Sequence, residues 1–251
     1  TANTVIVPWN DPEALVHATE QHDLAAIIAE PYPANMGLVP PVEGLLELLR
    51  ERASATGALL IFDEVITGMR VAPGGAQELT GVVPDLTVLG KIVGGGLPAA
   101  AFGGRAELME HLAPVGDVYQ AGTLSGNPLA TAAGTSVLRR LRDPGVYERL
   151  ERTGAALQAG LEPFGTVQRV GAMLTLFCHD APVRDDEDAS RADTARYGAL
   201  FRHLADAGVY LPPSAFEAWF LSAAHDDGAM DRIITALPAA ADAAARTGGR
   251  R

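Results

Sequence analysis

Two residues of the sequence combine a reactive side chain with a position at which a sheet would present it. Lys91 follows the mostly apolar run 85–89, and Asp63 follows the continuous apolar run 58–62. Lys91 is the only lysine in the chain and every other strong base is an arginine, so surface solvation alone does not account for it. Taken singly, each residue has an ordinary alternative, because an aspartate at a strand end is often a cap and a lysine there is usually solvated.

Together the two residues suit pyridoxal phosphate (PLP) chemistry. Open α/β sheets bind ligands beyond the carboxyl ends of their strands, and neighbouring strands would deliver both side chains to one crevice. The amine of Lys91 would form a Schiff base with the cofactor aldehyde and later move a proton, while Asp63 would keep the pyridine nitrogen protonated. Val65, two residues beyond Asp63, would point to the same face and pack on the ring. The glycine run 94–96 adds only a weak phosphate signal.

The scaffold that must hold these residues is predicted from apolar spacing and from the breaks between segments. Helices are expected over about 12–22, 42–56, 128–141, 147–161, 193–207 and 231–245, and strands over 5–8, 24–30, 58–62, 85–89, 167–178, 209–211 and 218–221. Continuous apolar strands that alternate with helices indicate a parallel sheet covered on both faces. The sequence therefore predicts an α/β domain over residues 1–143 and a small α+β domain over 144–251.

Composition narrows the classes of function. The chain has 251 residues, 48% of them hydrophobic, and a net charge of -12, which disfavours nucleic acid and anionic membrane as partners. The single cysteine, Cys178, cannot form an internal disulfide and is expected to be a buried core thiol. No apolar run approaches the ~18 residues of a membrane span. Without a signal peptide, the expected location is the cytoplasm. The histidines have no metal-ligand spacing, so no metal site is expected.

Three segments resemble the class III (fold type I) PLP-dependent aminotransferases, and the resemblance extends from Val5 to about Ala245. They are LLIFDEVITGMR, PDLTVLGKIVGGGLPAAAFGG and YQAGTLSGNPLA. Within that class the chain resembles the glutamate-1-semialdehyde 2,1-aminomutase branch in particular. The segments that favour this branch are EHLAPVGDVYQAGTLSGNPLA, LFCHDAPVRDDEDASRADTARY and GVYLPPSAFEAWFLSAAH.

The resemblance implies that residues 1–143 form the C-terminal half of a fold type I, PLP-binding large domain, followed by a small α+β C-terminal domain. It also implies roles for individual residues. Lys91 matches the Schiff-base lysine, Asp63 the partner of the pyridine nitrogen and Val65 the residue packed on the ring. Thr123 matches a threonine that reaches the phosphate of the neighbouring subunit's cofactor, which implies a homodimer with shared active sites. On the plainer interpretation Thr123 is an ordinary loop hydroxyl.

Two further positions bear on the substrate. Asn35 stands where many class III aminotransferases have a glutamate, and the aminomutases have an asparagine there, close to the cofactor. Glu217 stands in a region where amino-acid transaminases often place an arginine, so it would repel a second carboxylate and hold an amine instead. Both also have plainer interpretations, as a turn residue and a solvated loop carboxylate. Ala215 and Trp219 depart from the aminomutase pattern, and a bulky Trp219 beside Glu217 would narrow a pocket.

The function that the resemblance implies is an intramolecular amino transfer. The enzyme would convert glutamate-1-semialdehyde to 5-aminolevulinate for tetrapyrrole synthesis, with PLP and its pyridoxamine 5'-phosphate form as cofactor. The alternatives are a class III aminotransferase of another pathway, and a truncated, non-catalytic homologue that acts as a dimerisation module. The last is motivated by an absence, because the family's N-terminal part, with its phosphate cup, has no counterpart in these residues.

Overall fold

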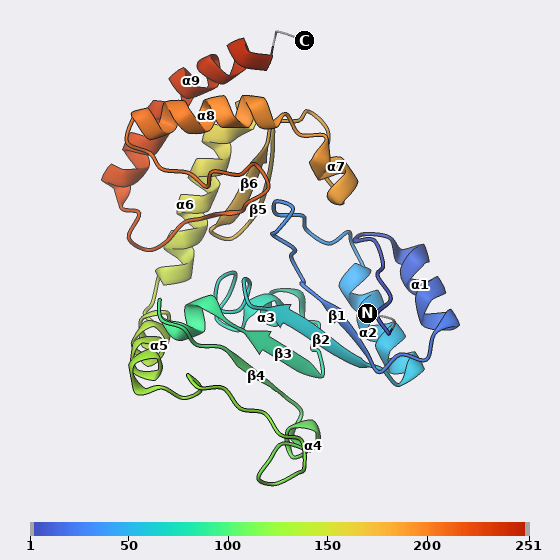
Figure 1. Cartoon of the computed structure of the whole chain (residues 1–251). Helices are drawn as coiled ribbons and strands as arrows, with labels where there is room; N and C mark the ends of the chain where they lie inside the picture. Colours follow the sequence, from blue (N-terminus) through green and yellow to red (C-terminus); the bar gives the residue numbers. More distant parts are fainter. Residues whose placement is uncertain (1–2, 249–251) are drawn as a thin grey trace. The chain divides into compact units, whose positions relative to one another are not determined.

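A computed structural model of the chain describes residues 3–248, which form two compact units (Figure 1). The first holds the residues up to Pro31 and those from Pro41 to Asp143, and the second holds the remainder. The expected division at 143/144 thus differs in the segment 32–40, which belongs to the second unit. Backbone hydrogen bonds explain the difference, because the N–H of Gly37 donates to the Phe216 carbonyl at 2.6 Å.

The first unit is built on a four-stranded sheet in the order β1-β2-β3-β4 (Figure 1). Its strands are β1 (Ala26–Ala29), β2 (Leu59–Glu64), β3 (Leu86–Leu89) and β4 (Ala101–Gly104). The first three are parallel, as the apolar runs predicted, and β4 is antiparallel to β3. The sequence Ala-Phe-Gly-Gly of β4 gave no strand signal, because it has neither an apolar run nor alternation. The predicted α/β fold is confirmed, with a mixed rather than purely parallel sheet.

The core of the first unit lies between β2 and the first two of its helices. The helices of this unit are α1 (Pro12–Gln21), α2 (Leu45–Thr56), α3 (Gly75–Thr80), the 3-10 turn η1 (Lys91–Gly94), α4 (Ala106–Met109) and α5 (Pro128–Arg140). Buried leucines of α1 and α2 pack on Leu60 and Phe62 of β2. The helix ends predicted at Asp11 and Gly57 are confirmed, since Asp11 caps α1 and Gly57 (φ 76°) ends α2. The predicted strand 5–8 is wrong: the segment forms no strand, and Ile6 is 90% exposed.

The second unit is an antiparallel sheet covered by helices. The strands β5 (Thr166–Val170), β6 (Met173–Phe177) and β7 (Trp219–Phe220) lie in that order. The helices are α6 (Val146–Leu161), the 3-10 turn η2 (Glu162–Phe164), α7 (Asp186–Ser190), α8 (Thr194–Asp206) and α9 (Asp227–Gly248). The single strand predicted over 167–178 is a hairpin instead, since Gly171 (φ 57°) reverses the chain. The strand predicted over 209–211 does not form.

A cluster of charged side chains lies around the buried Asp85 at the amino end of β3. Asp85, only 5% exposed, accepts from the Leu60 N–H and from Arg50 and Arg105, each at 2.8 Å. Burial alone would raise the pKa of the Asp85 carboxyl, but the Leu60 N–H and the two guanidinium groups outweigh it and lower the pKa below its usual value. The cluster lies at the opposite end of the strand from Lys91, so we assign it to stability.

Replacing Asp85 with asparagine should therefore lower the free energy of unfolding by about 2 kcal/mol at neutral pH, because charge-assisted hydrogen bonds are lost. The contribution of a carboxyl with a lowered folded-state pKa is complete above its unfolded-state pKa, near 3.8, and is lost as the pH falls through the folded-state pKa. Urea unfolding of both proteins at about pH 7 and about pH 3 should show the gap narrowing at the lower pH.

The matched control for this prediction is Glu107→Gln. Glu107 pairs with the same Arg105 at 2.7 Å, but both side chains are exposed, so little stability should change. A gap between Asp85→Asn and the unaltered protein that is equally wide at both pH values would contradict the assignment.

Candidate active site

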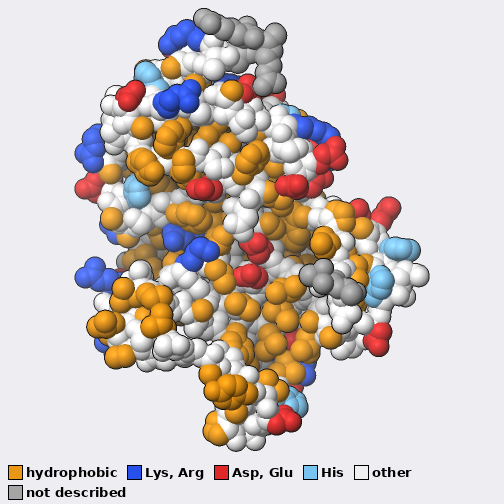
Figure 2. Space-filling model, viewed as in Figure 1, with side chains coloured by type: hydrophobic (Ala, Val, Ile, Leu, Met, Phe, Trp, Pro, Cys, Tyr) orange, Lys and Arg blue, Asp and Glu red, His pale blue; other side chains and the backbone are white. Residues whose placement is uncertain are grey.

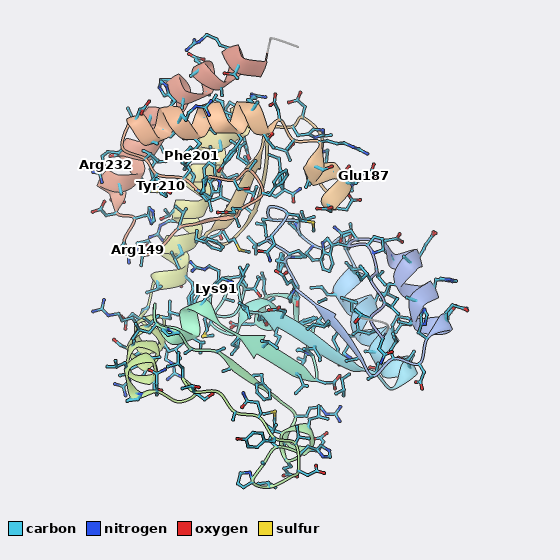
Figure 3. All side chains as sticks on the ribbon, viewed as in Figure 1. Lys91, Arg149, Glu187, Phe201, Tyr210 and Arg232 are labelled. Atoms are coloured by element: carbon cyan, nitrogen blue, oxygen red, sulfur yellow. The ribbon has the colours of Figure 1, made fainter. Side chains whose placement is uncertain are left out.

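Lys91 lies on a sharp turn at the carboxyl end of β3 (Figure 3). The strand ends at Leu89, Gly90 is extended, and η1 begins at Lys91 itself. Lys91 is exposed and has a φ of 46°, a left-handed conformation that is uncommon for residues other than glycine. Such conformations are costly and cluster at functional sites. The turn thus presents the only lysine of the chain at the strand edge where ligands bind.

Asp63 and Val65 lie at the carboxyl end of the neighbouring strand. β2 and β3 are parallel, and Asp63 stands opposite Val88 in the register. Both Asp63 and Val65 are half-buried, and the Val65 N–H donates to Asp63 Oδ1 at 3.0 Å, which fixes the carboxylate against its own backbone. A β-carbon at Gly90 would lie 3.1 Å from Val65 Cγ1, so Val65 packs beside the residue that precedes Lys91. The structure therefore places all three residues predicted to hold the cofactor at the carboxyl ends of two neighbouring parallel strands.

Glu64 is a residue of this region that the sequence interpretation missed. It is 1% exposed and accepts from the Ala76 N–H at 2.6 Å, from Thr67 Oγ1 at 3.0 Å and from Gln77 Nε2 at 2.9 Å. Gln77 Nε2 also donates to Thr87 Oγ1 of β3 at 2.9 Å. Because successive strand residues face opposite sides, Glu64 anchors α3 while Asp63 faces the other way. The adjacent Asp-Glu pair at a strand end was the signal that could have revealed it.

Thr123 lies in an exposed turn just before α5. Asn127 holds this turn to the helix, since its Oδ1 accepts from the Ala130 N–H and its Nδ2 donates to the Leu124 carbonyl, both at 2.9 Å. Hydrophobic side chains gather at the bottom of Figure 2. In the segment that leads to the Thr123 turn, Val115 is 79% and Tyr119 83% exposed. The role of Thr123 toward a partner's phosphate stays a prediction.

The two substrate candidates, Asn35 and Glu217, are both exposed and both belong to the second unit. Their loops are joined by the Gly37–Phe216 hydrogen bond and by the fully buried Thr175. Thr175 Oγ1 accepts from the Leu38 N–H at 2.9 Å and lies 3.4 Å from the Glu217 carbonyl oxygen, to which it donates. Two segments far apart in the sequence are thus held side by side, although their roles toward a substrate stay predictions.

Trp219 does not lie where the sequence interpretation put it. Its ring is 4% exposed in the core of the second unit, 6.4 Å from the ring of Tyr197. Burial also raises the pKa of Tyr197, whose hydroxyl donates to the Pro212 carbonyl at 2.7 Å. Ala215 is likewise buried, while Glu217 between them is exposed. The expectation that Trp219 narrows a pocket at Glu217 is therefore wrong, because the indole packs in the core: β7 consists only of Trp219 and Phe220, of which Trp219 is buried and Phe220 exposed.

Three further features of the described residues do not indicate a second catalytic site. Cys178 is buried, as predicted, and burial raises the pKa of its thiol to about 11. Within residues 3–248, no three histidine, cysteine or acidic side chains gather as a metal site. Across the same residues, none of the helices combines the length and the apolar character that crossing a bilayer requires.

Comparison with known proteins places these features in context. A family model described as aminotransferase class III matches residues 9–237. The glutamate-1-semialdehyde 2,1-aminomutase of Thermomicrobium roseum is 54% identical over 243 residues, which are 93% of this chain and 56% of that protein. A glutamate-1-semialdehyde 2,1-aminomutase of Brevibacillus brevis is 52% identical, with 93% and 57% covered. The chain thus spans little more than half the length of these relatives.

Solved structures give the same picture. An omega-transaminase from Sphaerobacter thermophilus superposes with a TM-score of 0.89 at 34% identity, covering 96% of this chain and 57% of that one. A glutamate-1-semialdehyde-aminomutase from Pseudomonas aeruginosa PAO1, in complex with PMP, superposes with a TM-score of 0.82 at 28% identity, covering 94% and 56%.

Proposed function

Because the chain belongs to the class III aminotransferase family, we propose that it carries the lysine-bearing half of a PLP-dependent glutamate-1-semialdehyde 2,1-aminomutase. The observation that carries the proposal is the left-handed turn at Lys91, which presents an amine beside the strand end of Asp63 and Val65. The reaction is supported by relatives of that name at 54% and 52% identity over nearly the whole chain.

The residues at the two strand ends fit PLP. When bound, PLP supplies an aldehyde for covalent attachment and a ring that accepts electrons. Lys91 would hold the aldehyde, the Asp63 carboxylate would keep a proton on the pyridine nitrogen, and Val65 would pack against the ring. The hydrogen bond from the Val65 N–H occupies Asp63 Oδ1 and leaves Oδ2 available for the ring nitrogen.

In the proposed reaction an amino group leaves C2 of the substrate and an amino group arrives at C1. Each half of this exchange moves one proton to or from a substrate carbon, and the Lys91 amine is the group placed to take and return it. No external amino donor is consumed, because the amino group removed in one half is supplied in the other. The net change is an isomerisation.

On the substrate side, Glu217 and Asn35 would select a molecule with one carboxylate. A carboxylate at Glu217 repels a second acidic group and can hold an amine, and its exposure leaves it accessible. Thr123 would reach the phosphate bound by a second subunit, so the working form would be a homodimer in the cytoplasm. The exposed Val115 and Tyr119 in the segment that leads to that turn support a buried contact in this region, because large apolar side chains are seldom left in water in groups.

An ordinary class III aminotransferase is the second candidate. The superposition on the omega-transaminase, with a TM-score of 0.89, favours it over the 0.82 found for the Pseudomonas aminomutase. The higher sequence identity to aminomutases favours the first candidate. The need for a separate amino donor distinguishes the two, since an aminotransferase stops after one half-reaction without it.

The test measures 5-aminolevulinate formed from glutamate-1-semialdehyde with no other amino donor. This chain should be assayed alone and joined to the part that precedes the matched region in the Thermomicrobium roseum relative. We expect no turnover by the chain alone, because the family's main phosphate cup lies in that part, and turnover by the joined protein. Turnover that needs an added donor would favour the aminotransferase. Robust turnover by the chain alone would show a phosphate site within these 251 residues.

A further inference from the structure

The turn that carries Lys91 lies directly against the backbone of α5. A β-carbon placed on Gly134 would overlap the carbonyl oxygen of Val93, which belongs to η1. From the other side, a β-carbon on Gly95 would lie 2.5 Å from the carbonyl carbon of Ala133. Helix and turn can approach this closely only because neither residue has a side chain.

This contact at Val93 lies two residues from Lys91, the strained residue of the turn. Lys91 has a φ of 46°, and a left-handed conformation persists at a non-glycine residue only where its surroundings enforce it. Within the turn, the Val93 N–H donates to Gly90 at 3.1 Å and the Gly95 N–H donates to Ile92 at 2.9 Å. Outside the turn, Val65 packs at Gly90 and α5 packs at Val93. The residues that flank Lys91 on both sides are therefore held by close packing.

A glycine in the interior of a helix lowers the stability of the helix, so its presence there calls for a structural explanation. Gly134 lies in the middle of α5, and only Gly134 and Ala130 of that helix are buried. We propose that Gly134 is a positioning residue for the Lys91 amine, acting through the carbonyl of Val93. The meaning of this role for catalysis rests on the proposed function, whereas the mechanical role does not.

The chain offers matched controls for Gly134→Ala. In α6, a β-carbon on Gly154 would overlap the carbonyl oxygen of Gly171, so Gly154→Ala creates the same kind of overlap in the second unit. In α8, a β-carbon on Gly198 would meet only the flexible Arg202 guanidinium, at 3.3 Å. The first control reproduces the damage without touching the Lys91 turn, and the second adds a helical methyl group without damage.

The single lysine makes the measurement selective. Reductive methylation with ¹³C-formaldehyde labels only Lys91 and the chain's N-terminal amine, and NMR reads the two labels separately. We expect Gly134→Ala to shift the methyl resonance of Lys91, while Gly154→Ala and Gly198→Ala leave it in place. In the unlabelled joined protein, Gly134→Ala should also slow borohydride-fixed attachment of added PLP to Lys91 at least ~10-fold, since a displacement of ~1 Å lowers positioned reactions ~100-fold.

Two results would overturn the proposal: an unmoved Lys91 resonance in folded Gly134→Ala, or an equal shift in Gly154→Ala. If Gly134→Ala does not fold, Ala130→Gly and Ala132→Gly decide, because both remove one methyl group from α5 but only Ala130 is buried. Ala130→Gly alone should then move the resonance, and no difference between them would refute the role of α5. A shifted resonance in this chain, with no PLP attachment at Lys91 in any variant of the joined protein, would uphold positioning and reject the proposed function.

Discussion

Lys91→Gly should abolish covalent attachment of PLP and lower turnover of the joined protein by at least ~10⁴-fold, because the nucleophile and the proton carrier are lost together. The same change should not destabilise the fold. Glycine adopts a φ of 46° without steric cost, so the free energy of unfolding should stay level or rise by up to about 1 kcal/mol. Turnover is measured by 5-aminolevulinate formation and PLP attachment by protein mass after borohydride reduction. The free energy of unfolding is measured by urea unfolding.

A second variant separates conformation from chemistry at this position. Lys91→Arg keeps the positive charge and the backbone strain but removes the nucleophilic amine, so it should lose attachment and turnover as fully as Lys91→Gly. If either variant still acquired covalent PLP at the level of the unaltered chain, the amine in use would be another one. In this chain that could only be the N-terminal amine.

Asp63→Asn should keep PLP attachment but lower turnover by about 10³-fold, or ~4 kcal/mol, because a charge partner is lost at a water-excluded site. Asparagine has almost the same size, and its Oδ1 can still accept from the Val65 N–H, so the local backbone should be preserved. Absorbance and borohydride fixation measure attachment, and 5-aminolevulinate formation measures turnover.

The neighbouring carboxylate provides the control for Asp63. Glu64→Gln should show the opposite pattern, with lower stability but near-normal turnover per folded molecule, because Glu64 anchors α3 from the buried side of the strand. A near-normal rate in Asp63→Asn would make Asp63 a structural cap. A lost rate with unchanged stability in Glu64→Gln would exchange the roles of the two carboxylates.

The placement of Lys91 and Asp63 at the ends of neighbouring strands could be predicted because buried parallel strands give a strong sequence signal. Both residues directly follow apolar runs, and in a parallel sheet such ends lie at one edge. Helix ends were also readable, since Asp11 and Gly57 have local signatures. These features depend on a few consecutive residues, so they can be recognised in a single sequence.

Features that depend on contacts between distant segments could not be predicted. The segment 32–40 joins the second unit through single hydrogen bonds to Phe216 and Thr175. Whether Trp219 faced the core or the site depended on where β7 begins, and a shift of one residue reverses the answer. Gly134 and the Lys91 turn can lie in contact because Gly134 has no side chain, and no spacing pattern in the sequence predicts such a contact.

The most direct test of the account is to find which amine of the joined protein carries PLP. The chain joined to the part that precedes the matched region in the Thermomicrobium roseum relative should be loaded with PLP, reduced with borohydride, digested and mapped by mass spectrometry. The preceding part can contribute competing lysines, whereas this chain contributes only Lys91. We predict that the cofactor is found on the peptide that contains Lys91 and on no other. Cofactor on a lysine of the preceding part, or on the N-terminal amine, would contradict the assignment of Lys91 and the function proposed from it.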